Sequence, residues 1–260
     1  MPELVYRPVI GAALAAFKAL DLRISVEGSE NVPATGGGVI ASNHVGYVDF
    51  VFTGLAARQR DKDRLVRFLA KKEIFDKRVP GMLMRGMKHI AVDRDAGAQS
   101  YRGAVEALRG GELIGMFPEA TISRSFRLKE FKNGAARMAA EAGVPLVPSV
   151  VWGTQRLLTK GRKRELVRHV PVLVRVGEPL HPTTSDDATE VTAELKARMT
   201  VLLDEAIAAY PEQPEPGAWW LPADLGGSAP TPEEAAELER ADVEARRARR
   251  AARAAKGAKG

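Results

Sequence analysis

Seven apolar runs of strand length alternate with stretches of helical periodicity, and this alternation limits the possible folds more than any other feature. The runs that we predict as strands are Leu22–Val26, Gly38–Ser42, Arg64–Leu69, His89–Val92, Leu113–Phe117, Leu146–Val151 and Pro171–Val176. Strands alternating with helices are typical of α/β domains. We therefore expect one α/β domain over residues 22–210, with a central, mixed β-sheet flanked by helices.

Four amphipathic helices are expected between and after the strands, and two of them end at glycines. Their predicted ranges are Asp49–Arg58, Ser100–Arg109, Phe131–Ala142 and Asp187–Tyr210. Gly110 and Gly143 follow two of them, and glycine ends helices readily because it adopts positive φ without strain. In the last helix, apolar residues recur at helical spacing, which indicates one buried face.

Residues 1–21 contain a ten-residue apolar stretch, Pro8–Phe17, between Arg7 and Lys18. It is shorter than the roughly 20 residues needed to span a bilayer. No convincing cleavage site follows it, so a signal peptide is not expected. We predict an N-terminal amphipathic helix that either packs on the domain or lies in a membrane interface, and the sequence favours neither alternative.

The C-terminal quarter differs in composition from the rest of the chain. Residues 211–232 contain six prolines and form a predicted Pro/Gly-rich linker, in which Trp219 and Trp220 are expected to dock on the domain or on lipid headgroups. Residues 233–260 turn from acidic to basic and are predicted to be a charged, largely disordered tail. The last sixteen residues carry seven cations and no anion, so the formal net charge of +6 belongs to this basic tail.

Composition also excludes several classes of site. The chain has no cysteine, which rules out disulfides, thiolate zinc sites and cysteine nucleophiles. Its four histidines form no close pair, so no metal site is expected. Because the chain without its tail is close to neutral, a dedicated nucleic-acid-binding fold is not expected, although the tail would attract any polyanion.

The strongest chemical motif is the segment 43–49, NHVGYVD, which follows the second predicted strand. If the chain turns at Gly46, Asp49 can reach one ring nitrogen of His44 and leave the other free to take a proton. This arrangement suits a general base. The alternative is a histidine that is satisfied by a helix-capping aspartate, and the motif alone does not separate the two.

Further blocks follow in order. They are Gly86 with Asp93–Arg94, Phe117–Thr121 (FPEAT) and Val144–Pro148 (VPLVP), accompanied by Lys71–Glu73 and Phe131–Ala135. With the segment 43–49, these blocks resemble those of the glycerophospholipid acyltransferase family, over about the first 180 residues. The resemblance implies transfer of a fatty acyl group from acyl-CoA or acyl carrier protein to a lysophospholipid, in the first place 1-acylglycerol-3-phosphate, to give phosphatidic acid.

The family resemblance also implies roles for single residues. His44 would be the general base and Asp49 would orient it, with no covalent acyl-enzyme and no cofactor beyond the acyl donor. The residues expected to bind substrate are Lys72, Arg94, Glu119, Thr121 and Arg124. Ala120 replaces the glycine usual in the family, and Ile122 replaces an arginine that helps to bind the acceptor phosphate. The acceptor is therefore open to another lysolipid or a glycolipid.

Two questions remain open from the sequence: what the basic cluster does, and whether the chain is an enzyme. A basic cluster in the sequence is a solvated face, an acidic-headgroup site or a docking patch for acyl carrier protein; it comprises Arg124, Arg127, Lys129, Lys132 and Arg137. The whole chain is an acyltransferase or a non-catalytic lipid or acyl-CoA binding protein, and the pairing of His44 with Asp49 favours the enzyme.

We expect a cytoplasmic protein that is peripheral on the inner face of the cell membrane, of unknown oligomeric state.

Overall fold

The computed structural model describes residues 3–93 and 97–257. The chain divides into two compact units. The sheet unit comprises residues 1–122 and 130–213, and the C-terminal unit comprises residues 123–129 and 214–260. The sheet unit thus extends close to the predicted boundary at residue 210, but the loop 123–129 belongs to the C-terminal unit.

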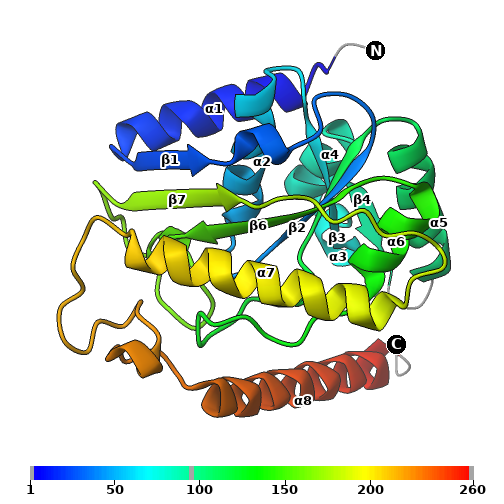
Figure 1. Cartoon of the computed structure of the whole chain (residues 1–260). Helices are drawn as coiled ribbons and strands as arrows, with labels where there is room; N and C mark the ends of the chain where they lie inside the picture. Colours follow the sequence, from blue (N-terminus) through cyan, green and yellow to red (C-terminus); the bar gives the residue numbers. More distant parts are fainter. Residues whose placement is uncertain (1–2, 94–96, 258–260) are drawn as a thin grey trace. The chain divides into compact units, whose positions relative to one another are not determined.

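A seven-stranded sheet forms the centre of the sheet unit (Figure 1). The strands are β1 (Arg23–Glu27), β2 (Gly38–Ser42), β3 (Val66–Lys71), β4 (Ile90–Val92), β5 (Leu113–Met116), β6 (Leu146–Trp152) and β7 (Pro171–Val176). Each of the seven predicted strands is present, with ends that differ by at most two residues. Their order in the sheet is β1-β7-β6-β2-β5-β3-β4.

The sheet is mixed, as predicted. The neighbours β6, β2, β5, β3 and β4 are all parallel to one another, whereas β7 is antiparallel to β6 and parallel to β1. Five strands therefore point their carboxyl ends to the same edge. In open α/β sheets this edge is where ligands bind.

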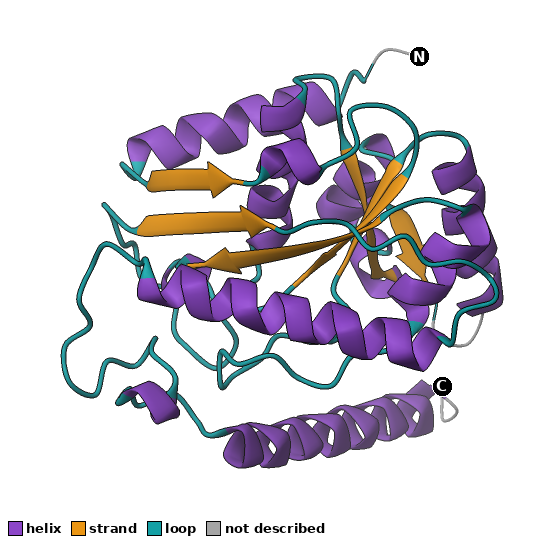
Figure 2. Ribbon diagram, viewed as in Figure 1, coloured by secondary structure: helices purple, strands orange, loops and turns teal. Residues whose placement is uncertain are grey.

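Helices cover both faces of the sheet (Figure 2). In the sheet unit they are α1 (Tyr6–Ala19), α2 (Asp49–Arg60), α3 (Lys72–Phe75), α4 (Arg78–Gly86), α5 (Gly97–Arg109), α6 (Gly134–Ala142) and α7 (Ala188–Ala208), with short 3₁₀ helices at Ser29–Asn31 and Thr154–Arg156. The helices α3 and α4 were not predicted; they are four and nine residues long, and some of their apolar side chains are exposed. No helix in the described residues is long and apolar enough to cross a membrane.

The main core lies between α2 and the sheet. Phe52, Ala56 and Ala57 of α2 are fully buried and belong to a cluster with residues from five of the strands. The strand members of this cluster are Ile40, Val66, Phe68, Leu113, Val147, Val151, Val172, Val174 and Val176. Because α2 begins at Asp49, this packing also fixes the position of the candidate catalytic segment.

The helix α1 packs on the sheet unit, which is one of the two alternatives left open for it. The Tyr6 hydroxyl donates to the carbonyl of Val66 at 2.7 Å, and the Phe17 ring stacks on that of Phe52. Glu3, just before the helix, forms ion pairs with Arg67 and Lys88. Although burial raises the pKa of Glu3, hydrogen bonds from these two cations lower it below its ordinary value.

The C-terminal unit contains a 3₁₀ helix, Ala223–Leu225, and α8 (Pro232–Gly257). A reciprocal cap starts α8, since Thr231 and Glu234 each accept a hydrogen bond from the other's main-chain N–H. The structure has one helix, α8, over most of the segment that the sequence predicted to be a largely disordered tail. The alanine, glutamate and arginine residues of this segment are strong helix formers.

Candidate active site

Predicted site residues from three strands lie at the carboxyl edge of the parallel part of the sheet. His44 follows β2, Glu119 follows β5 and Thr154 follows β6, and these three strands are neighbours in the order β6-β2-β5. Lys72 follows β3 and Asp93 follows β4, further along the same edge. Blocks that lie far apart in the sequence are therefore brought together by the order of the strands.

His44 and Asp49 form the predicted pair. The distance from Nδ1 of His44 to Oδ2 of Asp49 is 2.9 Å. The same carboxylate oxygen accepts the main-chain N–H groups of Val45 and Gly46, at 2.7 and 2.8 Å. Oδ1 accepts the hydroxyl of Thr154. Asp49 is fully buried, and a carboxylate, which only accepts hydrogen bonds, matches these donors.

Gly46 allows the tight turn that closes this pair because it has no side chain, and not because it adopts positive φ. A Cβ at this position would lie 3.0 Å from the carbonyl oxygens of both Thr154 and Leu158. The turn is thus pressed against the segment that follows β6. Tyr47 N–H donates to that Leu158 oxygen at 2.8 Å, and the Thr159 hydroxyl donates to the Val45 carbonyl at 2.6 Å.

Asn43, the first residue of the motif, anchors the turn to β6. Its side-chain Nδ2 donates to the carbonyl of Val151 at 3.0 Å, and its Oδ1 accepts the N–H of the same residue at 2.7 Å. Asn43 is fully buried. This pair of bonds continues the sheet ladder through a side chain and sets the direction in which His44 leaves β2.

Glu119 holds the main chain of His44. Its Oε1 accepts the His44 N–H at 2.8 Å, and the side chain is buried. Two residues earlier, the Phe117 ring stacks on the imidazole, with 4.1 Å between ring centroids and 14° between planes. The imidazole is therefore held by Asp49 and Phe117, and the main chain by Glu119, while 19% of the His44 side chain remains exposed.

The other predicted substrate-binding residues lie in different surroundings. Lys72 Nζ lies 2.7 Å from Oδ2 of Asp93, so the two ends of β3 and β4 are linked by an ion pair. Arg94 lies outside the described residues. Thr121 is half-buried in the same loop as Glu119, and Ile122, which stands in place of an arginine, is buried.

Ala120 adopts a left-handed conformation, with φ of +61°. Its N–H donates to the carbonyl of Phe117 at 3.0 Å and closes a tight turn between Phe117 and Glu119. A residue with a Cβ is strained in this region of φ, whereas glycine is not. This conformation explains the glycine that the family resemblance leads one to expect here.

The residues of the predicted basic cluster are divided between the two units. Within the C-terminal unit, Arg124 lies 2.8 Å from Asp242, Lys129 lies 2.6 Å from Glu239, and Arg127 pairs with Asp224. Arg137 belongs to the sheet unit, where it lies over the Tyr101 ring. Arg124, expected to bind substrate, is therefore engaged by a carboxylate of the same chain.

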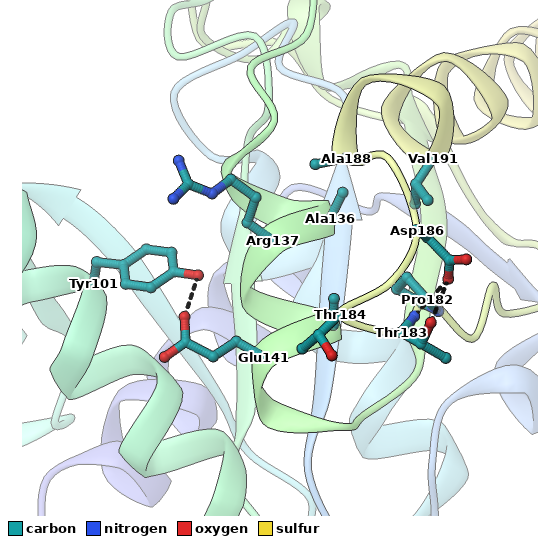
Figure 3. A pocket seen from close by; sticks show the side chains of 11 residues that line it. Tyr101, Ala136, Arg137, Glu141, Pro182, Thr183, Thr184, Asp186, Ala188 and Val191 are labelled. Atoms are coloured by element: carbon teal, nitrogen blue, oxygen red, sulfur yellow. Dashed lines mark hydrogen bonds between the residues drawn. The ribbon is translucent and has the colours of Figure 1, made fainter.

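A shallow cavity of about 280 Å³ lies between α5, α6 and the segment before α7 (Figure 3). Its lining includes Tyr101, Arg137 and Glu141, together with small residues such as Ala136 and Ala140. The Tyr101 hydroxyl donates to Glu141 at 2.8 Å, and burial, reinforced by this carboxylate, raises the pKa of Tyr101 to about 12. Among the residues that the structure describes, no predicted site residue lines this cavity.

Thr154 is the main site residue that the sequence did not reveal. The only signal for it is its place directly after a buried strand, next to a glycine with φ of +102°.

In the part of the chain that the structure describes, no group of three or more His, Cys, Asp and Glu side chains is placed to hold a metal ion.

The chain matches the family model described as Acyltransferase over residues 23–152. It is 31% identical, over 196 residues, to a 1-acyl-sn-glycerol-3-phosphate acyltransferase of Bacillus subtilis, covering 75% of this chain and 92% of that protein. It is 32% identical over 168 residues to the chloroplastic LPAT1 of Arabidopsis thaliana, covering 63% of this chain but 45% of the plant protein.

A solved structure gives the same picture of the fold. The 1-acyl-sn-glycerophosphate (LPA) acyltransferase PlsC from Thermotoga maritima matches with a TM-score of 0.66 and 25% sequence identity, over 79% of this chain and 81% of that one. The matched family region includes the segment 43–49 and the Phe117–Thr121 block. His44, Asp49 and Glu119 thus lie within the matched family region, whereas Thr154 lies two residues beyond its end and most of the C-terminal unit lies outside it.

Proposed function

The chain belongs to the acyltransferase family and is an O-acyltransferase, and we propose that it transfers a fatty acyl group to the free hydroxyl of 1-acylglycerol-3-phosphate. The product would be phosphatidic acid, and the donor a thioester, either acyl-CoA or acyl carrier protein. The observation that carries this proposal is the buried pair of Asp49 and His44, which is placed at the carboxyl edge of the sheet by partners from two neighbouring strands.

In the proposed reaction, His44 acts as the general base. Its Nδ1 faces Asp49, which fixes the tautomer with hydrogen on Nδ1 and leaves Nε2 to accept a proton. Nε2 takes the proton of the acceptor hydroxyl while the oxygen attacks the thioester carbonyl carbon. The tetrahedral intermediate then collapses, the carbon–sulfur bond breaks, and the thiolate takes the proton back from the imidazolium. General-base assistance of this kind contributes about 10² to 10⁴ in rate.

An anionic acceptor is supported by the order of the strands. Neighbouring strands are about 4.8 Å apart, so the end of β3 lies about 10 Å from the end of β2. Lys72 begins α3 at this end of β3, two strands away from the strand that leads to His44. A lysine side chain and a glycerol phosphate together span this distance, so the phosphate would lie towards β3 when the hydroxyl lies at His44.

The absence of cysteine gives a direct assay. The purified protein is incubated with palmitoyl-CoA and 1-acylglycerol-3-phosphate, and free thiol is followed with a disulfide dye, since every thiol must then come from CoA. We expect release that requires the acceptor and is lost in His44→Ala. The control His169→Ala removes an exposed histidine that also pairs with an aspartate, Asp21, and should keep full activity.

Other outcomes change the proposal. Release that occurs only with a different lysolipid or a glycolipid would mean that Ile122, in place of an arginine, redirects acceptor choice. Release that requires an acylated carrier protein would identify the donor. No release with any pair of donor and acceptor, or equal release from His44→Ala, would contradict the catalytic proposal.

A further inference from the structure

The helices α3 and α4 display apolar side chains to solvent. Val79 and Met82 of α4 are 59% and 60% exposed, and Ile74 of α3 is 36% exposed. Large apolar side chains that protrude singly are common on proteins, but several that gather on one short segment mark an interaction site. These three lie within nine residues of the sequence.

Helical spacing places cations on the same face. Arg78, Met82 and Arg85 are four and three residues apart, so they lie above one another on α4, and Val79 adjoins them three residues before Met82. Arg78 and Arg85 are exposed, as is Lys77 just before the helix. Between residues 71 and 88 the chain has six cations and two acidic residues. Lys72 and Lys88 pair with carboxylates outside this range, and the four remaining cations still exceed the two acidic residues, so this surface attracts anions.

The surface is rigid. A Cβ on Gly81 would lie 2.0 Å from the carbonyl oxygen of Phe75, so α4 packs directly against the end of α3. The Arg85 guanidinium donates to that same carbonyl at 2.7 Å. Gly86 at the other end of α4 touches Val5, which precedes α1. The exposed side chains therefore project from a fixed helix pair.

The helix pair also lies beside the candidate active site. The first residue of α3, Lys72, directly follows β3, whose carboxyl end lies on the same edge of the sheet as His44. A lysolipid acceptor sits in a bilayer with its headgroup at the interface. A protein surface next to the site that enters this interface would bring the acceptor hydroxyl to His44 without extracting the lipid.

We propose that Ile74, Val79 and Met82, with Lys77, Arg78 and Arg85, form a surface that binds the headgroup region of an anionic phospholipid bilayer. Only the biological role of this α3–α4 surface depends on the proposed function, because binding to the bilayer is measured without substrate. Apolar side chains interleaved with lysine and arginine are the pattern of segments that lie in an interface. The cations supply attraction to anionic lipid, and the apolar side chains enter between the headgroups.

The test is sedimentation of the full chain with vesicles of phosphatidylcholine alone and with 30% phosphatidylglycerol added. Val79→Ser with Met82→Ser should lower the partition coefficient on anionic vesicles at least tenfold. The matched control, Leu166→Ser with Val201→Ser, removes two apolar side chains that are 85% and 58% exposed elsewhere and should change it less than twofold.

A second pair of variants tests the charges. Lys77→Gln with Arg78→Gln should weaken binding at low salt and reduce its dependence on salt. The control Lys163→Gln with Arg164→Gln removes two adjacent exposed cations in a loop and should have a smaller effect. The cations of α8 also attract anionic vesicles, but they are the same in all variants and so do not affect the comparison.

Three results would overturn the inference. They are unchanged vesicle binding of the Val79 and Met82 variant, equal losses in the variant and its control, and a loss of binding to acyl carrier protein in place of vesicles. Thiol release with a short-chain, monomeric acceptor separates this inference from the proposed function. Retained release with lost vesicle binding supports both proposals, whereas absent release in every variant contradicts only the proposed function.

Discussion

The main-chain N–H of His44 donates to Oε1 of Glu119 at 2.8 Å, although 75 residues separate the two in the chain. The bond joins two sequence blocks that follow neighbouring parallel strands, β2 and β5. Glu119, expected to bind substrate, holds the main chain of His44 through this oxygen. The carboxylate is buried, so in this role it is a positioning residue.

Substitution of Glu119 separates its shape from its charge. Glu119→Gln keeps a side-chain carbonyl that can accept the His44 N–H, so we expect a loss in kcat of only a few-fold. Glu119→Ala leaves a buried donor without a partner, which costs about 1–3 kcal/mol of stability. We expect kcat to fall at least tenfold in that variant. Thiol release and the midpoint of urea unfolding measure the two effects; equal activity of both variants would refute the positioning role.

Thr154 is expected to act through Asp49. Thr154→Val removes the hydroxyl that donates to Oδ1 and leaves the shape of the side chain almost unchanged. We expect kcat to fall about tenfold, equivalent to about 1.4 kcal/mol, with little change in acceptor KM. Thr154→Ser keeps the donor and should retain most of the activity. A pH–rate profile whose acid limb is the same in all three proteins would argue against this coupling.

Ala120 is strained by its φ of +61°. A left-handed conformation costs a residue with a Cβ about 1–2 kcal/mol, so Ala120→Gly should stabilise the sheet unit by about 1 kcal/mol. Ala135→Gly, in the buried face of α6, is the matched control and should destabilise by about 1 kcal/mol, because glycine is unfavourable inside a helix. Urea unfolding measures both, and a destabilising Ala120→Gly would contradict the prediction.

His89 makes stability depend on pH. Its ring is buried between Tyr6 and Phe68, and its Nδ1 accepts the Phe68 N–H at 3.0 Å. Burial, with the nearby charge of Arg67, lowers the pKa of His89 from 6.5 to about 4. Between these values the unfolded chain binds a proton that the folded chain does not, so the free energy of unfolding decreases as pH falls.

The loss attributable to His89 reaches about 3 kcal/mol below pH 4 and is absent at pH 7 and above. His89→Asn keeps an acceptor for the Phe68 N–H but cannot titrate. We expect its stability to fall less steeply than that of the parent chain between pH 6.5 and 4. Unfolding midpoints across this range measure the difference, and parallel curves for the two proteins would show that the group does not contribute.

The C-terminal unit holds the loop 123–129 through ion pairs and one aromatic contact. Hydrogen bonds from Arg127 lower the pKa of Asp224, and Phe126, at φ of +58°, packs its ring edge to face with that of Trp219. Exposed pairs contribute up to about 1 kcal/mol each. Neutralising Asp224, Glu239 and Asp242 together should therefore open the loop about ten times more often.

Limited trypsin digestion reads out this opening, because the loop contains cleavage sites after Arg124, Arg127 and Lys129. The triple variant Asp224→Asn, Glu239→Gln and Asp242→Asn should be cut there about tenfold faster. The control Glu233→Gln, Glu237→Gln and Glu244→Gln removes the same charge from exposed positions of α8 and should be cut at the parent rate. Equal cleavage of the two variants would mean that the ion pairs do not hold the loop.

Local features of the fold and site were readable from the sequence. Seven apolar runs predicted seven strands, and the range Gly38–Ser42 is identical in prediction and structure. The segment 43–49 predicted the contact of His44 with Asp49 because both partners lie in one turn, where chain connectivity limits their separation. The pattern failed for α4, a helix of nine residues in which Val79 and Met82 are exposed and Leu83 and Met84 are half-buried.

Contacts between distant segments depended on the order of the strands, which the amino-acid pattern does not encode locally. Nothing near Glu119 or Thr154 in the sequence indicates that β5 and β6 lie on either side of β2. For the same reason, the pairing of Arg124 with Asp242, 118 residues away, was not predicted. The sequence by itself determined which residues form strands and which turn carries His44, because those follow from neighbouring residues; the tertiary structure alone decided what surrounds that turn, because its partners are selected by packing across the sheet.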